Sequence, residues 1–273
     1  EDYKVYAKQY FPNTKSVAIF GGESGSFDTS LGVVSTPEYG KVFIAIESTT
    51  GNNLTDTEKS SLITALSPFT VASITPVIVD TQSTNLILGV TFQFDSSKTT
   101  ETTTSLASLV SSTLRTYNIS NLAQFDGAFR HSKVTGLIDD TDTSITSNIT
   151  TVTLAHNLTP TLSTATAYTI QLNNAFYNPH SGHNSSSGGV LASTGFKVSG
   201  DTTNVQFFDD DGAGNIRRYI LVAGVRQYQN NTAGTITYTT GEIKISSVNI
   251  TSVENVDEVA SSFIRLTVHQ TPL

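Results

Sequence analysis

The hydrophobic pattern of this chain changes character at about residue 161. Up to that point, segments with helical spacing of apolar residues alternate with strand-like segments, and beyond it the helical spacing disappears. The remainder of the chain is a series of short runs that alternate apolar and polar residues, separated by Gly or Asn/Asp turns: 168–172, 195–199, 204–208, 217–225, 234–240, 241–250 and 262–269. Such a series predicts a β-sandwich or a barrel-like module, with the polar stretch 177–190 as a loop.

Residues 1–82 predict a first small mixed domain. Its expected strands are 16–20, 40–48 and 74–81, and in the second of these Val42, Ile44 and Ile46 share one face. Acidic residues open a helix over 1–10. A second helix begins where Thr55 and Glu58 have the spacing of a capping box, presents Leu62, Leu66 and Phe69 on one face, and ends at Pro68.

Residues 83–160 repeat the mixture. Segment 85–94 places every second residue, from Leu86 to Phe94, on one apolar face, which is typical of a strand. Segment 99–117 has helical spacing, segment 144–158 has the pattern of a strand, and segment 121–132 offers Asn121 and Gln124 as caps for an apolar stripe of Leu122, Phe125 and Phe129. The expected fold is therefore α+β: two small mixed α/β domains, 1–82 and 83–160, followed by a mainly antiparallel, sandwich-like β domain, 161–273.

Composition excludes several classes of function. The chain has no cysteine, so disulfides, thiolate metal sites and cysteine nucleophiles are impossible. Its net charge of −8, with only 15 Lys and Arg residues and no basic patch, argues against binding to nucleic acid. No apolar run approaches the roughly 20 residues that span a bilayer, and no signal peptide is recognisable. Because the chain also contains no methionine, we expect it to be a piece of a longer polypeptide.

The stretch "QFFDDDGAGNIRRY", Gln206 to Tyr219, raises the question of a calcium loop. Asp209, Asp211 and Asn215 could supply oxygen ligands. An EF-hand loop, however, needs a Glu at position 12 and a helix after it, whereas position 12 counted from Asp209 is Ile220 and the flanks are strand-like. The favoured interpretation is a β-hairpin whose turn uses Asp, Gly and Asn.

The remaining polar motifs carry weaker signals. The pair His180 and His183 lies in a Ser/Gly loop without an evident third ligand. The segment "GGESGS" lacks the spacing of a phosphate-binding loop. Neither the adjacent carboxylates, Asp139–Asp140 and Asp209–Asp210, nor the scattered histidines His131 and His156 form a catalytic pattern, and the sequons at Asn148 and Asn249 are interpreted as accidental. The sequence thus predicts no catalytic, cofactor-binding or metal site and no enzyme.

A resemblance to a known family lies in the order and spacing of several blocks. Segments 1–24, 37–48, 54–66, 71–80 and 129–148, then "FFDDDGAGNIRRY" and "GTITYTTGEIKI", resemble the C-terminal half of T4-type bacteriophage baseplate wedge subunits of the baseplate-J-like kind. The resemblance implies a structural protein of a contractile tail, which pairs with itself as a homodimer and with other wedge proteins, joins wedges into a ring and relays the baseplate's change of shape. It also implies a virion protein that is assembled in the bacterial cytoplasm, and a family N-terminal portion that is missing from this chain.

Two alternatives stay open beside this structural role. One is a cell-surface or carbohydrate-binding β module, with a calcium-dependent version through Asp209 and Asp211. The other is a hydrolase that uses acids of the β module. For the structural role, the aromatic residues considered as interface anchors are Phe20, Phe27, Tyr39, Phe176, Tyr177 and Tyr228, each of which could equally belong to a core.

Overall fold

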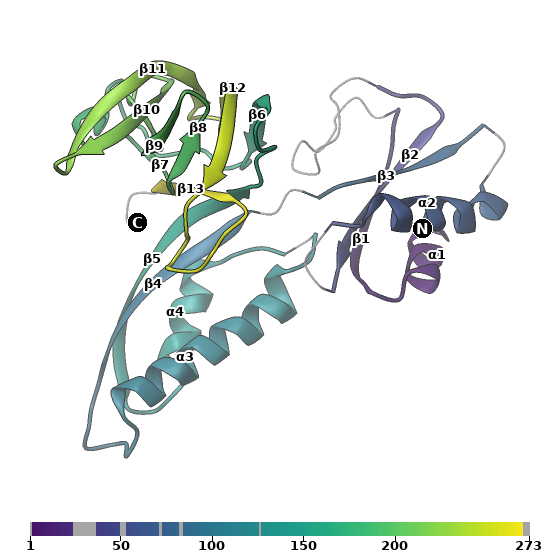
Figure 1. Cartoon of the computed structure of the whole chain (residues 1–273). Helices are drawn as coiled ribbons and strands as arrows, with labels where there is room; N and C mark the ends of the chain where they lie inside the picture. Colours follow the sequence, from purple (N-terminus) through teal and green to yellow (C-terminus); the bar gives the residue numbers. More distant parts are fainter. Residues whose placement is uncertain are drawn as a thin grey trace. The chain divides into compact units, whose positions relative to one another are not determined.

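The computed structural model describes residues 2–23, 37–49, 53–70, 73–81, 84–125 and 127–269 (Figure 1). The chain folds into two compact units, one made of residues 1–82 and 90–150 and the other of residues 83–89 and 151–273. The architecture is α+β with a mainly β C-terminal part, as the sequence predicts. None of the helices in the described ranges is long and apolar enough to cross a membrane.

The N-terminal part of the first unit is a three-stranded sheet with two helices. Its elements are α1 (Asp2–Tyr10), β1 (Thr14–Gly21), β2 (Lys41–Ser48), α2 (Asp56–Leu66) and β3 (Thr75–Val79). β1 and β2 are antiparallel, whereas β2 and β3 are parallel because α2 carries the chain back between them. The buried cluster that joins the helices to the sheet includes Ala7, Ile44, Ile46, Leu62 and Leu66, which confirms the predicted inner faces of β2 and α2.

Helix α2 begins and ends as the sequence predicts, with one correction. The Thr55 hydroxyl accepts a hydrogen bond from the Glu58 amide at 3.3 Å, and the Glu58 carboxylate accepts one from the Thr55 amide at 2.8 Å, so the capping box is present. Pro68 lies in a 3₁₀ turn, Ser67–Phe69, that follows the helix. Phe69 therefore leaves the helical face; it is 40% exposed and stacks on Tyr6, with 4.0 Å between ring centroids.

The central segment holds a strand, two helices and a second strand. These are β4 (Asn85–Phe94), α3 (Thr103–Tyr117), α4 (His131–Asp139) and β5 (Ile145–Leu158). β4 neighbours β5 in its sheet, and its burial alternates with a period of two along the whole strand, as predicted. The hydroxyl of Thr102 caps α3 by accepting from the Ser105 amide at 3.2 Å, and Leu106, Val110 and Tyr117 form its buried face.

The helical stripe predicted over 121–132 is wrong. α3 ends in a single π-helical turn, Asn118–Leu122, and the next helix starts only at His131, with Val134 and Ile138 as its buried face. Gly127 lies between the two helices, where the backbone packs so closely that a Cβ would clash with the Leu122 carbonyl oxygen.

The C-terminal unit contains strands and no α-helix within its described residues. Besides the parts of β4 and β5 that belong to it, its strands are β6 (Ala165–Gln171), β7 (Leu191–Ser193), β8 (Phe196–Val198), β9 (Asp201–Asp210), β10 (Asn215–Val222), β11 (Val225–Thr237), β12 (Glu242–Val253) and β13 (Ile264–His269). The antiparallel pairings β9–β10, β10–β11, β11–β12, β12–β8 and β8–β9 close a ring of five strands. This closed pairing is that of a barrel, so the expectation of a sandwich-like domain is corrected in favour of the barrel-like alternative.

The apolar core of this unit lies among the inward-facing residues of these strands. Phe196 of β8 and Phe208 of β9 are fully or almost fully buried and stack, with 4.5 Å between ring centroids. β7 pairs with both β9 and β13, and β13 pairs with β5. β7 and the first half of β11 were not predicted. The end of β9, where three aspartates follow one another, therefore lies at the junction of β7, β9 and β10.

Candidate functional site

The aspartate cluster lies in a β-hairpin, which confirms the favoured sequence interpretation. β9 and β10 are antiparallel and in register, with Asp209 opposite Arg217 and Asp210 opposite Ile216. In the turn, the Asp211 carboxylate accepts hydrogen bonds from the amides of Ala213 and Asn215 at 2.8 and 3.0 Å. It also accepts one from the Asn215 side chain at 2.7 Å. The Asp211 carboxylate thus holds the hairpin turn closed.

These hydrogen bonds change the acidity of Asp211. Partial burial raises the pKa of its carboxyl group, but the donors from Asn215 and Ala213 outweigh this effect, and the pKa lies below its usual value. The carboxylate therefore stays ionised at neutral pH, and its charge stabilises the turn.

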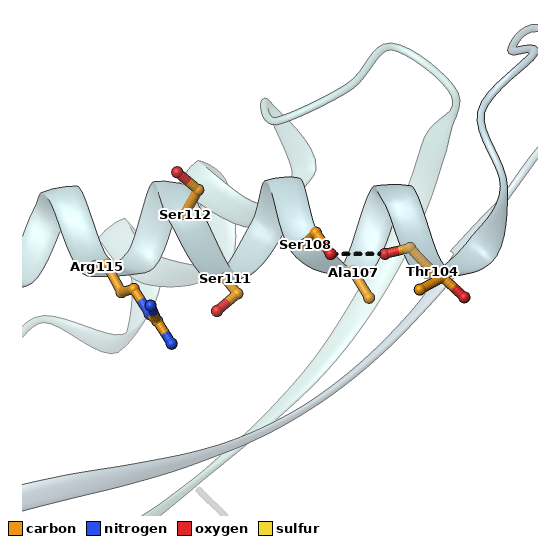
Figure 2. Close-up of a pocket in the computed structure, with 6 residues that line it drawn as sticks. All are labelled: Thr104, Ala107, Ser108, Ser111, Ser112 and Arg115. Atoms are coloured by element: carbon orange, nitrogen blue, oxygen red, sulfur yellow. Dashed lines mark hydrogen bonds between the residues drawn. The ribbon is translucent and has the colours of Figure 1, made fainter.

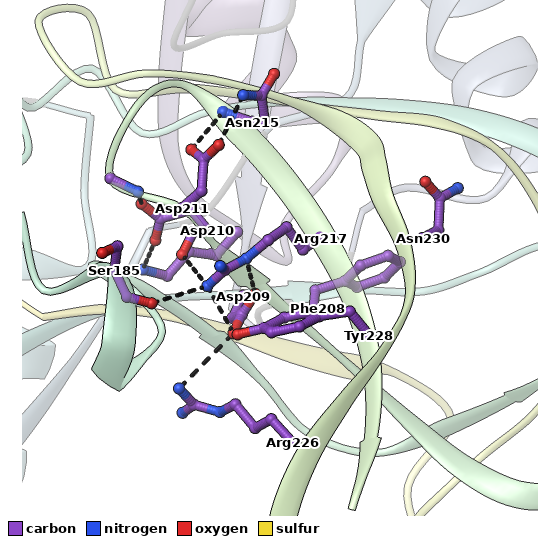
Figure 3. Close-up of polar contacts among 12 residues, drawn as sticks. Ser185, Phe208, Asp209, Asp210, Asp211, Asn215, Arg217, Arg226, Tyr228 and Asn230 are labelled. Carbon is purple, nitrogen blue, oxygen red and sulfur yellow. Dashed lines mark hydrogen bonds and ion pairs between the residues drawn. The ribbon is translucent and has the colours of Figure 1, made fainter. Parts of the chain in front are cut away.

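Asp210 is a fully buried carboxylate whose oxygens are both occupied (Figure 3). One oxygen accepts from the amides of Val190 and Leu191, both at 2.7 Å, and so fixes the start of β7. The other accepts from the Gly212 amide at 3.0 Å and from the Tyr238 hydroxyl at 2.7 Å. Burial and the hydrogen bond to Asp210 raise the pKa of Tyr238 far above its usual value, so Tyr238 remains a donor.

Asp209 is 1% exposed and pairs with an arginine on the neighbouring strand. Arg217 donates to both carboxylate oxygens, from Nε at 2.9 Å and from Nη2 at 3.2 Å, which is the two-pronged geometry that arginine favours. The Tyr228 hydroxyl donates to Asp209 at 3.0 Å, and an Nη atom of Arg226 lies 3.7 Å from the same oxygen. Burial nevertheless raises the pKa of Asp209 above its usual value, and the attraction of Arg217 opposes that shift.

The two arginines also join the cluster to its surroundings. The guanidinium of Arg217 lies over the Tyr228 ring, 4.2 Å from its centroid, and donates to the carbonyl oxygens of Ser185 and Asp210 at 3.2 and 2.8 Å. Arg226 lies over the Tyr219 ring at 5.0 Å. The cluster thus ties the loop before β7 to the outer face of β9, β10 and β11.

This arrangement is suited to fixing the backbone of the hairpin and the loop before β7, and it is poorly suited to binding a metal ion. Every carboxylate oxygen of Asp209, Asp210 and Asp211 accepts at least one hydrogen bond from the protein. A calcium ion would have to displace the guanidinium of Arg217 from Asp209 before that carboxylate could become a ligand. In the described ranges, no group of three or more His, Asp or Glu side chains is placed to hold a metal ion.

Sequence reasoning found the turn but missed the buried network around it. Arg217, Arg226 and Tyr238 were not singled out, and Asp209 and Asp210 were interpreted as turn residues although both are buried. One signal was present in the sequence: a hairpin centred on 212–214 places Asp209 opposite Arg217. Asp210 forms its hydrogen bonds with Val190, Leu191 and Tyr238, which lie about 20 to 28 positions away in the sequence. No local sequence pattern predicts such distant contacts.

The other predicted polar residues lie apart from this cluster. His131 begins α4, and its Nε2 atom lies 2.9 Å from the Thr150 carbonyl oxygen. Asp139 accepts a hydrogen bond from the Asn148 side chain at 2.7 Å, which is an ordinary contact between α4 and β5. His156 lies on β5, opposite Leu266 of β13. His180 and His183 lie in the loop before β7, with their rings in contact. The second half of the segment "GGESGS", residues 24–26, lies outside the described residues.

The aromatic residues considered as interface anchors differ in their surroundings. Phe176 belongs to the core of the β unit, and Tyr228 belongs to the aspartate cluster. Phe20 is partly buried and stacks on Phe43. Tyr39 and Tyr177 are 79% and 46% exposed and remain available for a partner. Phe27 lies outside the described residues.

A shallow depression runs along one face of α3 (Figure 2). It is lined by side chains from this helix alone: Thr104, Ala107, Ser108, Ser111, Ser112 and Arg115. The Ser108 hydroxyl donates to the Thr104 carbonyl oxygen at 2.9 Å, so it is engaged within the helix. Its lining has one charged side chain, Arg115, and no Asp, Glu, His or Lys that could act as a general base beside the hydroxyl groups.

Comparison with known families identifies two parts of the chain. Residues 1–79 match the model of "Baseplate structural protein gp6, C-terminal domain I", and residues 87–157 match "Baseplate structural protein gp6, C-terminal domain III". No curated protein sequence matches the chain significantly. The two matched stretches together cover more than half of the chain, and both belong to a family that is described as structural. The chain is therefore a structural protein of a phage tail baseplate and carries domains of the gp6 family.

Proposed function

We propose that this chain is a wedge subunit that joins neighbouring wedges of a contractile-tail baseplate into a ring and relays the baseplate's change of shape. The observation that carries the proposal is the pair of gp6 domain matches in one chain. The function is exerted through protein–protein contacts with a second copy of the chain, as a homodimer, and with other wedge proteins. The narrower membership in the baseplate-J-like family and assembly in the host cytoplasm belong to this proposal.

The polar groups of the β unit support a mechanical role. The aspartate cluster cross-links the loop before β7 to three barrel strands through buried, charge-assisted bonds. A unit that is held together in this way can transmit a displacement at its surface without deforming. The proposed role involves no catalytic step and no bound cofactor.

Exposed apolar residues offer surfaces for the proposed contacts. The tip of the β10–β11 hairpin exposes Leu221, Val222 and Val225 by 51%, 51% and 69%, and Tyr39 is exposed on the other unit. Contiguous exposed apolar patches mark candidate protein contact surfaces, and aromatic residues are enriched in them. The proposed division into domains 1–82, 83–160 and 161–273 is supported by the matched stretches, which end at residues 79 and 157.

Light scattering of the purified chain over a wide concentration range tests self-association. The proposal predicts a mass that rises toward that of a dimer, and a strict monomer at the highest concentration would contradict the homodimer. Co-purification of the full-length parent with other tail proteins, followed by electron microscopy, tests ring formation. Complexes that close into rings are expected, and a parent that purifies alone would contradict the joining role.

The calcium-dependent carbohydrate-binding alternative has a direct test of its own. A ligand at 100 times its dissociation constant adds about 2.7 kcal/mol to the free energy of unfolding. Thermal unfolding of the chain with and without calcium should show no shift if the proposed structural role of Asp209 and Asp211 holds. A shift that disappears in Asp211→Asn would favour the alternative.

A further inference from the structure

Strand β4 is an edge strand without the features that usually protect an edge. It is the last strand of its sheet and lies beside β5 (Figure 1). None of its 10 residues, Asn85–Phe94, is charged or is proline. Natural edge strands are commonly kept from pairing with other chains by lysine, by proline or by short length. The two edges of the N-terminal sheet follow this rule, because β1 contains Lys15 and the short β3 contains Pro76. Within the described part of the chain, β4 is therefore open to a further strand.

The contacts with β5 show which backbone groups of β4 lie on the open side. The Thr151 hydroxyl donates to the Gly89 carbonyl oxygen at 3.3 Å, and the Thr146 hydroxyl donates to the Gln93 carbonyl oxygen at 3.2 Å. The two strands are thus antiparallel, and both acceptors face β5. In an antiparallel pair, consecutive residues turn their N–H and C=O groups to opposite sides of the strand. The residues that turn these groups to the open edge are therefore Leu86, Leu88, Val90, Phe92 and Phe94.

The side chains of these five residues form one apolar face of the strand. They are partly buried, whereas the side chains that alternate with them are exposed. The rings of Phe92 and Phe94 lie together on this face, with 6.4 Å between their centroids. A strand that continues the sheet must therefore supply backbone hydrogen bonds at every second residue and apolar side chains on the same face.

A second copy of β4 meets both requirements. In an antiparallel pair that is related by a two-fold axis, each residue meets a residue of the same strand. With the axis at Val90, this residue meets its own copy, and Leu88 meets Phe92 of the second copy. Leu86 likewise meets Phe94 of the second copy. Each pair lies at a hydrogen-bonding position and places two apolar side chains side by side, which stabilises a sheet. Because the strand is uncharged, no like charges meet.

We propose that the open edge of β4 is a self-association surface, at which two copies of this chain pair antiparallel about a two-fold axis at Val90. The sheet then runs from β5 and β4 of one copy into β4 and β5 of the other. Pairing of the whole strand forms up to about ten backbone hydrogen bonds, since each of the five opposed pairs exchanges two. This inference rests on the homodimer of the proposed function and adds the surface that forms it.

Disulfide cross-linking of the full chain tests the register, because the chain contains no cysteine of its own. Directly opposed residues in hydrogen-bonded pairs have Cα atoms about 5.5 Å apart, which a disulfide can span. Val90→Cys should therefore give a covalent dimer under mild oxidation. The matched control is Gln93→Cys, whose two copies would lie ~20 Å apart in this register, so it should stay uncross-linked. Failure of Val90→Cys to cross-link, or equal cross-linking of both variants, would overturn the proposed pairing.

A charge at the edge tests the pairing without a covalent bond. Thr91→Lys places a lysine on the exposed face of β4, next to the two-fold axis, where it would approach its own copy. We expect the dissociation constant of the dimer, measured by analytical ultracentrifugation, to rise at least about tenfold, because like charges are brought together. The control is Ile149→Lys on β5, because Ile149 is 72% exposed and lies one strand away from the edge. This variant should dimerise as the unmodified chain does, and equal effects of the two substitutions would contradict the proposal.

Amide hydrogen exchange separates a wrong surface from a wrong homodimer. The N–H groups of Leu88, Val90 and Phe92 should gain protection as the concentration rises through the dissociation constant, whereas those of Gly89 and Thr91, which face β5, should be protected throughout. A chain that is a dimer by mass but leaves the first three amides unprotected would overturn the β4 surface and leave the homodimer standing. A chain that stays monomeric at the highest concentration would overturn both. Protection that appears only after another tail protein is added would assign the edge to that protein and overturn the second copy as its partner.

Discussion

Substitution of Asp210 by Asn tests the claim that a buried carboxylate organises the β unit. Asp210 has no exposed surface and accepts four hydrogen bonds: from Val190 and Leu191 on one oxygen, and from Gly212 and Tyr238 on the other. Asn has the same shape but only one oxygen, so it must present its amino group to one of these two pairs of donors.

The structure indicates which pair is disturbed. The Asn oxygen keeps both neighbouring backbone amides, Val190 and Leu191, if the amino group faces Gly212 and Tyr238. The tyrosine hydroxyl can rotate and accept, but the Gly212 N–H group then meets another donor. Loss of one hydrogen bond to a charged acceptor costs about 1.5–3 kcal/mol, and the remaining bonds lose their charge assistance. An amide is less costly to bury than a carboxylate, which offsets part of this loss. We therefore expect the free energy of unfolding to fall by about 3 kcal/mol.

Guanidinium denaturation followed by circular dichroism measures this change, because the chain has no tryptophan to report it by fluorescence. The slope with denaturant should not change, so the difference appears in the midpoint. Amide hydrogen exchange at Val190 and Leu191 localises the effect to the start of β7. The matched control is Asp139→Asn, because Asp139 is exposed and accepts a single side-chain bond from Asn148. Asp139→Asn should lower the free energy of unfolding by less than about 1 kcal/mol.

Two outcomes would refute this reasoning. One is an Asp210→Asn variant that unfolds within about 0.5 kcal/mol of the unmodified chain, since surface substitutions commonly have effects of that size. The other is a loss no larger than that of Asp139→Asn. Asp210→Ala removes the acceptor altogether and should destabilise more than Asn does; if it fails to fold, the Asn variant still decides the question.

Three further predictions concern local structure. Thr55→Ala removes the cap of α2 and should lower the free energy of unfolding by about 1 kcal/mol in denaturant titrations; an unchanged midpoint would contradict the capping role. Hydrogen bonds from Ser97 lower the pKa of the Asp95 carboxyl group. Their contribution to the free energy of unfolding is therefore complete above the ordinary carboxyl pKa, and it is lost as the pH falls through the lower pKa of the folded state. Asp95→Asn should therefore flatten the acid limb of a stability–pH profile, and an unaltered limb would refute this assignment. Gly189 has φ +63°, and Gly189→Ala would place a Cβ against the buried Asp210 carboxyl group. The substitution should lower the free energy of unfolding by about 2 kcal/mol or more, measured by thermal unfolding. Gly200→Ala, at φ +90° with open space around it, should cost less, and equal losses would argue against the clash.

The elements that sequence reasoning predicted correctly are those whose signals are local. The capping box of Thr55 and Glu58 needs only a few consecutive residues, and the alternation along β4 is complete within the strand itself. The change of pattern at about residue 161 likewise predicted the β-rich C-terminal part, because short alternating runs separated by turn residues need no knowledge of the partner strand.

The errors arose where distant contacts decide the structure. The apolar spacing of Leu122, Phe125 and Phe129 suggested a helix, but the chain leaves the helical path after Leu122 and packs Gly127 closely against the Leu122 carbonyl oxygen. The Phe125 amide instead donates to the Ser16 hydroxyl, far away in the sequence, at 3.4 Å. A helical spacing of apolar residues indicates which side chains can share one face of a helix. It carries no information about backbone groups that form hydrogen bonds with distant residues.

The candidate site shows the same limit. The turn at Asp211 is predicted by Asp, Gly and Asn in succession, and this prediction was confirmed. The burial of Asp210 depends on β7, a strand of three residues that is too short to show a period of its own. Only when the loop before β7 folds over the hairpin do the amides of Val190 and Leu191 reach this carboxylate.

The central claim is that this chain is built into a phage baseplate as a structural part. Immunoelectron microscopy of intact particles, with antibodies raised against the purified chain, tests it most directly. The account predicts label at the end of the tail that is distal to the head, on particles whose tails are assembled. Label on the capsid or along the tail shaft, or its absence from particles under conditions in which the antibodies bind the purified chain, would contradict it.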